Sequence, residues 1–190
     1  MTRKRTIIVA VAALLAGAAT AAVAWFASPE RLPWVARAAE PLWTETQWPF
    51  LTDQWGKGKA FRCSAADCGT EVSLYVRAKI GFCNCTTGVA DDAELERLSD
   101  FDLVGNDVAA LGDGRPISVA WMKGRSRAYG LPGKNRPGGA ALSIAFNDRC
   151  DAIVATAVVG RDRPIAVEPA VIDFLNSKTV LRWAEVTLGL

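Results

Sequence analysis

Residues 61–85 read FRCSAADCGTEVSLYVRAKIGFCNC, and the rest of the chain is organised around this stretch. Near its centre, residues 71–80 alternate apolar and polar side chains at a strict period of two. That period predicts a β-strand with one buried face and one solvated face, and half-solvated strands are typical of antiparallel sheets. Four of the five cysteines of the chain flank this strand within the same stretch. It therefore bears on both the fold and the chemistry.

Other segments show strand or helix patterns around this central strand. Apolar runs predict four more strands, over 59–63, 116–122, 140–146 and 151–159. Residues 91–104 have helical spacing with Asp91 as N-cap, and Glu168–Pro169 is expected to open a C-terminal helix that Ser177 recaps. We expect an α+β domain with about five mainly antiparallel strands, an inserted helix and a C-terminal helix packed on the sheet.

The N-terminus has the features of an exported, membrane-anchored chain. A basic tail over 1–5 precedes an uncharged run over 6–27, which is long enough as a helix to cross a bilayer. Positive charge before such a run keeps the N-terminus in the cytoplasm. We expect a single transmembrane helix there, in a bacterial-type inner membrane, with the domain in the periplasm. A signal peptide cleaved after 36–38 is the alternative, and it exports the same domain.

A connector over 28–58 precedes the globular domain, which we expect at 59–190. The connector contains four prolines, so one continuous helix is excluded. It also contains four tryptophans, at Trp34, Trp43, Trp48 and Trp55. Two interpretations remain open. These side chains pack on the domain or rest among lipid headgroups, or they anchor a membrane partner, because exposed aromatic residues dominate many interfaces.

Composition excludes several classes of function. The chain of 190 residues has a formal net charge of +2, too small for the basic field that nucleic-acid binding requires. It contains no histidine, which removes Ser-His-Asp and Cys-His catalysis and the commonest metal ligand. An enzyme based on carboxylates is a third interpretation, for which the sequence offers no recognisable catalytic constellation.

Opposite charges gather in two segments. Residues 91–113 are strongly acidic, whereas the Gly- and Pro-rich residues 123–139 predict a loop without any acidic side chain. The basic residues of that loop are Lys123, Arg125, Arg127, Lys134 and Arg136. Three interpretations are open for them: simple solvation, contact with anionic lipid, and pairing with an acidic surface on a partner or on this chain.

Disulfides are the expected chemistry of the cysteines, because exported thiols meet an oxidising compartment. The candidates are Cys63, Cys68, Cys83, Cys85 and Cys150. Cys63 and Cys68 flank a tight loop, and Cys150 is expected to reach Cys83 or Cys85. Cross-pairing between the first two and the next two cysteines is the alternative. An odd number leaves one thiol unpaired.

Other cysteine chemistries fit the spacing less well. A metal site of four thiolates would be typical of paired Cys-x2-Cys motifs, which the chain lacks. Cys83 and Cys85 are separated by one residue, closer than in a Cys-x-x-Cys redox motif, so a bond between them would be strained. Buried free thiols are a further interpretation. We expect no metal and no cofactor.

These observations favour a non-enzymatic accessory or assembly subunit of a membrane complex. The expected partners are the membrane, through the N-terminal helix, and an inner-membrane protein, with no nucleic acid. The alternative is a periplasmic thiol-redox or metal-handling protein that uses Cys83 and Cys85.

Overall fold

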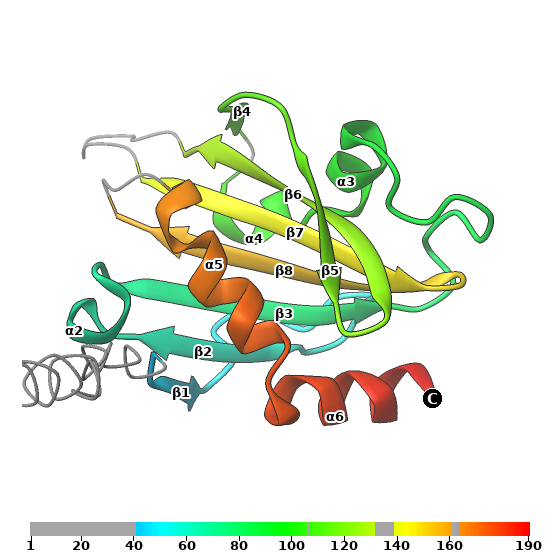
Figure 1. Cartoon of the computed structure of the whole chain (residues 1–190), viewed down its shortest axis with the longest axis horizontal. Helices are drawn as coiled ribbons and strands as arrows, with labels where there is room; N and C mark the ends of the chain where they lie inside the picture. The colour runs from blue at the N-terminus through cyan, green and yellow to red at the C-terminus, as the bar shows by residue number, and fades with distance from the viewer. Residues whose placement is uncertain (1–40, 106, 132–138, 161–163) are drawn as a thin grey trace, which may run out of the picture. The chain divides into compact units, whose positions relative to one another are not determined.

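The computed structural model of the chain describes residues 41–105, 107–131, 139–160 and 164–190 (Figure 1). The expected basic tail, the expected transmembrane helix over 6–27 and the start of the connector lie outside these residues. Within the described ranges, no helix combines the length and the apolarity that a membrane span requires.

A single antiparallel sheet of eight strands forms the framework of the described residues. Across the sheet the order is β1 (Trp43–Thr46), β2 (Lys59–Cys63), β3 (Val72–Lys79), β8 (Asp151–Val159), β7 (Ala140–Asp148), β6 (Met122–Gly130) and β4 (Ala109–Ala110). The remaining strand, β5 (Arg115–Val119), also pairs with β6. Figure 1 shows β3, β8, β7 and β6 as the long central strands.

The expectation of about five strands was wrong, because β1, β4 and β6 were missed. The most important error concerns β6, which occupies residues that we expected to be a loop. Its two glycines and three cations hide the strand pattern in the sequence. In the structure Gly124 lies against β7, where a Cβ would come within 2.0 Å of the Ala145 carbonyl oxygen. A glycine in a sequence usually indicates a turn, but Gly124 is required here because two strands pack closely at this position.

The structure has five helices in its described part, whereas we expected an inserted helix and a C-terminal helix that Ser177 recaps. Their bounds are α2 (Ala65–Cys68), α3 (Asp92–Leu98), α4 (Phe101–Val104), α5 (Pro164–Leu175) and α6 (Lys178–Leu188). The expected helix over 91–104 is two short helices, because Ser99 takes an extended ψ of 149°. The C-terminal helix begins at Pro164 instead of Glu168, so Pro169 lies inside α5.

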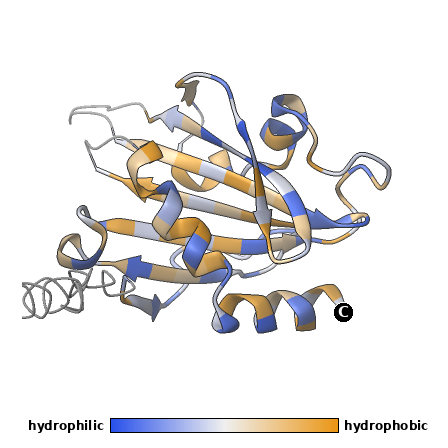
Figure 2. Cartoon of the chain, viewed as in Figure 1, coloured by the Kyte–Doolittle hydropathy of each residue, from blue (hydrophilic) through white to orange (hydrophobic). Residues whose placement is uncertain are grey.

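One face of the sheet is apolar and is covered by α5 and α6. Helix α5 contacts β6, β7 and β8, and α6 contacts β3. Figure 2 shows hydrophobic colouring along much of β7 and β8 and mixed colouring around α6. Buried residues such as Leu74, Leu142 and Ile153 pack there against Val171 and Leu175 of α5. This face contains the larger of the two hydrophobic clusters of the described residues.

The opposite face is covered by α3 and α4, and here a second expectation was wrong. The alternation in β3 predicted a solvated polar face, but Arg77 and Lys79 are only 2% and 4% exposed. A small apolar cluster containing Leu95 and Leu98 of α3 lies on the same side. The polar side chains of β3 are therefore interior groups that need internal partners.

Candidate functional site

The candidate site is a cleft on the polar face of the sheet, with a volume of about 540 Å³. Its walls come from β3, from the loop before β2, from the loop after β3 and from the α3–α4 region. The lining residues are Asp53, Gln54, Trp55, Arg77, Lys79, Phe82, Arg97 and Asp102. The cleft thus combines segments that are far apart in the sequence.

A buried ion network forms the floor of this cleft. The Arg77 guanidinium donates from Nε and one terminal nitrogen to the two carboxylate oxygens of Asp100, at 2.7 and 2.6 Å. Its other terminal nitrogen donates to Asp53 at 2.5 Å. Lys79 Nζ lies 2.8 Å from the Asp100 carboxylate and donates to the Leu98 carbonyl at 2.7 Å. Two cations therefore share one buried carboxylate.

The charged state of Arg77 is stabilised by these partners. Burial alone lowers the pKa of the guanidinium, but the hydrogen bonds to Asp100 and Asp53 outweigh it, and the pKa is raised. Burial would raise the pKa of Asp53, but the hydrogen bonds that its carboxylate accepts from Arg77 and from the Trp55 backbone N–H lower this pKa on balance. Both groups remain charged at neutral pH, so the network is an ion pair and not a neutral hydrogen-bonded pair.

Aromatic rings form the walls of the cleft. The rings of Trp55 and Phe82 meet edge to face with centroids 4.7 Å apart. Lys79 Nζ lies 5.4 Å from the Trp55 ring centroid, and the Arg97 guanidinium lies 4.6 Å from that of Phe82. Both distances are typical of cation–π contacts. The rings hold the cations in place and leave a mixed aromatic and charged surface at the mouth.

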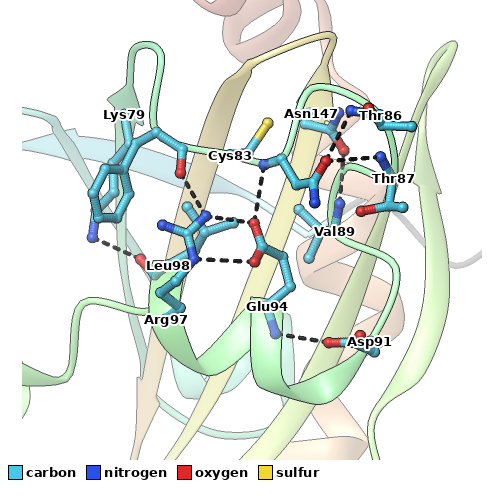
Figure 3. A network of polar contacts seen from close by, with 12 residues as sticks. Lys79, Cys83, Thr86, Thr87, Val89, Asp91, Glu94, Arg97, Leu98 and Asn147 are labelled. Atoms are coloured by element: carbon cyan, nitrogen blue, oxygen red, sulfur yellow. Dashed lines mark hydrogen bonds and ion pairs between the residues drawn. The ribbon is translucent and has the colours of Figure 1, made fainter.

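Helix α3 positions Arg97 at this mouth. The Asp91 side chain caps the helix by accepting the Glu94 N–H at 2.8 Å. Arg97 donates to both Glu94 carboxylate oxygens and, at 2.6 Å, to the Phe82 carbonyl. Figure 3 shows Arg97 facing the Glu94 carboxylate, with Lys79 reaching the Leu98 carbonyl. The hydrogen bonds that Glu94 accepts from Arg97 are the main reason that the pKa of the Glu94 carboxyl is lowered.

Recognition is the chemistry that this arrangement supports best. Among the described lining residues there is no hydroxyl or thiol nucleophile, and each of the three cations has an anionic partner. No group of three or more metal-ligating side chains lies within the described ranges. Preformed clefts with aromatic walls and a few fixed charges are typical binding sites.

The predicted basic residues have partners in this structure where it describes them. Arg125 pairs with Asp92 at 2.6 Å, and Arg127 pairs with Glu96 at 2.7 Å. Lys123 Nζ donates to the Ser118 hydroxyl at 3.1 Å. Internal pairing with the acidic segment, one of the interpretations above, therefore occurs for Arg125 and Arg127. Lys134 and Arg136 lie outside the described residues.

The predicted connector tryptophans contact the domain at separate places. Trp43 stacks on Phe174 of α5 with centroids 4.7 Å apart, and Trp48 meets Tyr75 of β3 at 6.1 Å. Trp55 is the one that enters the cleft. Trp34 lies outside the described residues. Packing on the domain, one of the two interpretations above, thus occurs for these three side chains.

The cysteines form two disulfides, Cys63–Cys68 and Cys85–Cys150, and leave Cys83 as the free cysteine. The expected disulfide chemistry is present, which is consistent with an oxidising compartment. Cys83 and Cys85 are not bonded to each other. Burial is the main reason that the pKa of the Cys83 thiol is raised.

Sequence reasoning missed the residues at the centre of the cleft, namely Arg77, Lys79, Asp100, Phe82 and Arg97. One signal was present. Two cations at alternate positions of a strand, followed by a strongly acidic segment, indicate that the strand and the segment can meet. That signal does not say which carboxylate is buried, because burial depends on how α3 and α4 lie on the sheet.

Comparisons with known proteins identify no relative: no family description fits the chain, no curated protein matches it, and no solved structure matches its fold.

Proposed function

We propose that this chain is a non-enzymatic accessory or assembly subunit of a membrane complex, which binds a protein partner through the cleft between Trp55 and Arg97. The observation that carries the proposal is the composition of that cleft. It gathers a tryptophan, a phenylalanine and two arginines around one concavity. Trp and Arg are enriched among the residues that contribute most to protein–protein binding, and such residues cluster in pockets.

Preorganisation supports a binding role for the same cleft. Arg77 and Lys79 are held by Asp100, and Arg97 is held by Glu94, before any partner arrives. A partner therefore meets side chains whose conformations are already restricted, which reduces the entropy lost on binding. The two disulfides support an exported domain, and the predicted N-terminal anchor would keep it beside an inner-membrane partner.

The test compares two tryptophans in full-length protein purified from detergent-solubilised membranes after crosslinking. Trp55 lies in the cleft, whereas Trp121 is 50% exposed in the turn between β5 and β6. Trp55→Ala is expected to reduce the amount of crosslinked partner by about tenfold or more, since truncating a central aromatic residue costs about 2 kcal/mol or more. Trp121→Ala is the matched control and should retain the partner.

The proposal fails if Trp55→Ala and wild type yield the same crosslinked proteins in the same amounts. It also fails if no protein crosslinks to the wild type above the background from membranes that lack the chain. A thermal unfolding curve for each variant shows whether a loss of partner comes from the cleft or from unfolding.

A further inference from the structure

Cys83 lies directly against the turn that carries one half of the Cys85–Cys150 disulfide. Its backbone N–H donates to the Cys150 carbonyl oxygen at 3.1 Å. Its thiol donates to the carbonyl oxygen of Arg149, the preceding residue, also at 3.1 Å. Both bonds join the loop after β3 to the turn between β7 and β8. A free thiol and a disulfide thus occupy the same small region.

Other contacts hold that loop and the turn together. The Asn147 side-chain oxygen accepts the Val89 N–H at 3.1 Å, and Gly88 has a φ of 60° where a Cβ would come within 2.3 Å of the same side chain. Gly81 N–H donates to Asp151 at 2.6 Å. The loop therefore has fixed contacts at both ends, which keep Cys83 beside Cys150.

Cys150 has two cysteine partners within reach. It is bonded to Cys85, with Cα atoms 4.2 Å apart. The Cys83 backbone N–H is 3.1 Å from the Cys150 carbonyl oxygen, so the backbones of these two residues are in direct contact. Direct backbone contact of this kind is what a disulfide between two residues requires, since it joins Cα atoms only about 4.4–6.8 Å apart. The Cys63–Cys68 disulfide has no third thiol to serve as such a partner, since all five cysteines are described and Cys83 is the free one.

We propose that Cys83, Cys85 and Cys150 form a thiol–disulfide exchange site. The Cys83 thiolate attacks the sulfur of Cys150, and a new bond forms between these two sulfurs. The Cys85–Cys150 bond breaks, and its electron pair leaves on the Cys85 sulfur. Cys83 gives its proton to water, and Cys85 takes a proton from water. The exchange is balanced and needs no external oxidant or reductant.

The exchange changes which thiol is accessible. Cys83 is 6% exposed, whereas Cys85 lies in the exposed part of the loop. After the exchange the free thiol is on Cys85, where the disulfide of an exported protein or a small disulfide compound can react with it. Reactive cysteines need such access. This activity is independent of partner binding by the cleft.

The surroundings of Cys83 disfavour its thiolate, first through burial and then through nearby carboxylates. Burial raises the Cys83 pKa, the carboxylates of Glu94 and Asp151 raise it further, and Arg97 opposes them. Asp148, the last residue of β7, lies 3.8 Å from the guanidinium of Arg149, which is exposed in the turn between β7 and β8. Because the thiolate is the attacking species, the rate should increase as the pH rises toward the pKa of Cys83.

The experiment is alkylation of the oxidised, folded, full-length protein with N-ethylmaleimide at pH about 8.5, near the ordinary thiol pKa. No reductant is present, and the sample is acid-quenched and digested in acid to prevent later exchange. Mass spectrometry is expected to find at least about tenfold more label on Cys85 than on Cys83, because exposure and thiolate character govern reactivity. The same peptides should contain a Cys83–Cys150 disulfide.

Cys83→Ser is the matched variant, because it removes the attacking thiol and keeps the Cys85–Cys150 disulfide. It should show no label on Cys85, and Cys63–Cys68 should stay unlabelled in both proteins. The proposal is overturned if wild type is labelled on Cys83 with Cys85–Cys150 intact, or on Cys150, or on no cysteine before denaturation. Label on Cys85 in Cys83→Ser would also overturn it, since the exchange would then not start from Cys83.

Discussion

The two faces of the sheet are held by different interactions. Under α5 and α6, apolar side chains such as Leu74, Leu142 and Ile153 are fully buried against one another. Under α3 and α4, Arg77 and Lys79 are buried to a similar extent around Asp100. Apolar packing is non-directional and tolerates changes of shape, whereas a buried ion network depends on each partner. The cleft lies on the face whose geometry is more strictly specified.

The largest effect is expected from removing the shared carboxylate. Asp100→Ala should lower the free energy of unfolding by about 3–5 kcal/mol, because it leaves two buried cations without their common partner. Urea denaturation measures this difference. The control is Asp102→Ala in α4, an exposed carboxylate whose loss should cost within about 0.5 kcal/mol. Equal costs for the two variants would show that the network does not stabilise the polar face.

The two disulfides provide the next comparison, since Cys63 is part of the apolar cluster and Cys85–Cys150 joins the loop after β3 to the β7–β8 turn. Their sequence separations are 5 and 65 residues. Replacing both Cys85 and Cys150 by Ala should cost about 4 kcal/mol, against about 2 kcal/mol for the same change at Cys63 and Cys68, because longer loops lose more entropy on closure. Guanidinium unfolding of the two double variants measures both. The reverse order would contradict this loop-length argument.

A conservative substitution on each face distinguishes the two kinds of packing. Arg77→Lys should cost about 1.5–3 kcal/mol, because lysine cannot make the two-pronged contact with Asp100. Leu142→Met, which nearly conserves volume on the apolar face, should cost less than about 1.5 kcal/mol. The midpoint and slope of urea unfolding give both values. If Leu142→Met is the more destabilising of the two, the proposed contrast between the faces is wrong.

The smallest effect is a pH dependence at Asp92. The Gly114 N–H bond is the main cause of its lowered pKa, and Arg125 adds to it. A lowered native pKa contributes stability that is present above the ordinary value of 3.8 and is lost as the pH falls through the native pKa. Wild type should therefore exceed Asp92→Asn in stability at neutral pH, and this difference should shrink in acid.

Unfolding curves at neutral pH and at pH about 3, below the ordinary range for Asp, measure this change. Asp113→Asn is the control, because Asp113 is an exposed residue of the same acidic segment. A difference between wild type and Asp92→Asn that stays constant across this pH range would show that the pKa of Asp92 is not lowered in the folded state.

The spacing of apolar residues predicted those strands in which one face or both faces are buried in the core. The expected strand over 59–63 coincides with β2, the one over 151–159 with β8, and the one over 71–80 nearly with β3. Strand β6 could not be found in this way, because its arginines are satisfied by Asp92 and Glu96 on α3. Alternation also led us to expect a solvated polar face on β3. That pattern shows that the two faces of a strand differ, but it does not show whether another element covers the polar one.

The sequence by itself determined local features: the alternation of β3, the capping of α3 by Asp91 and of α6 by Ser177, and an odd number of cysteines with one thiol left over. These depend on residues close together in the chain. Only the tertiary structure decided that Asp100 is buried between Arg77 and Lys79, that Trp55 meets Phe82, and that Cys150 pairs with Cys85 beside Cys83. Such contacts join segments that are far apart in the sequence. Many alternative pairings of these residues agree equally well with the local sequence, and the packing of helices and loops on the sheet selects one of them.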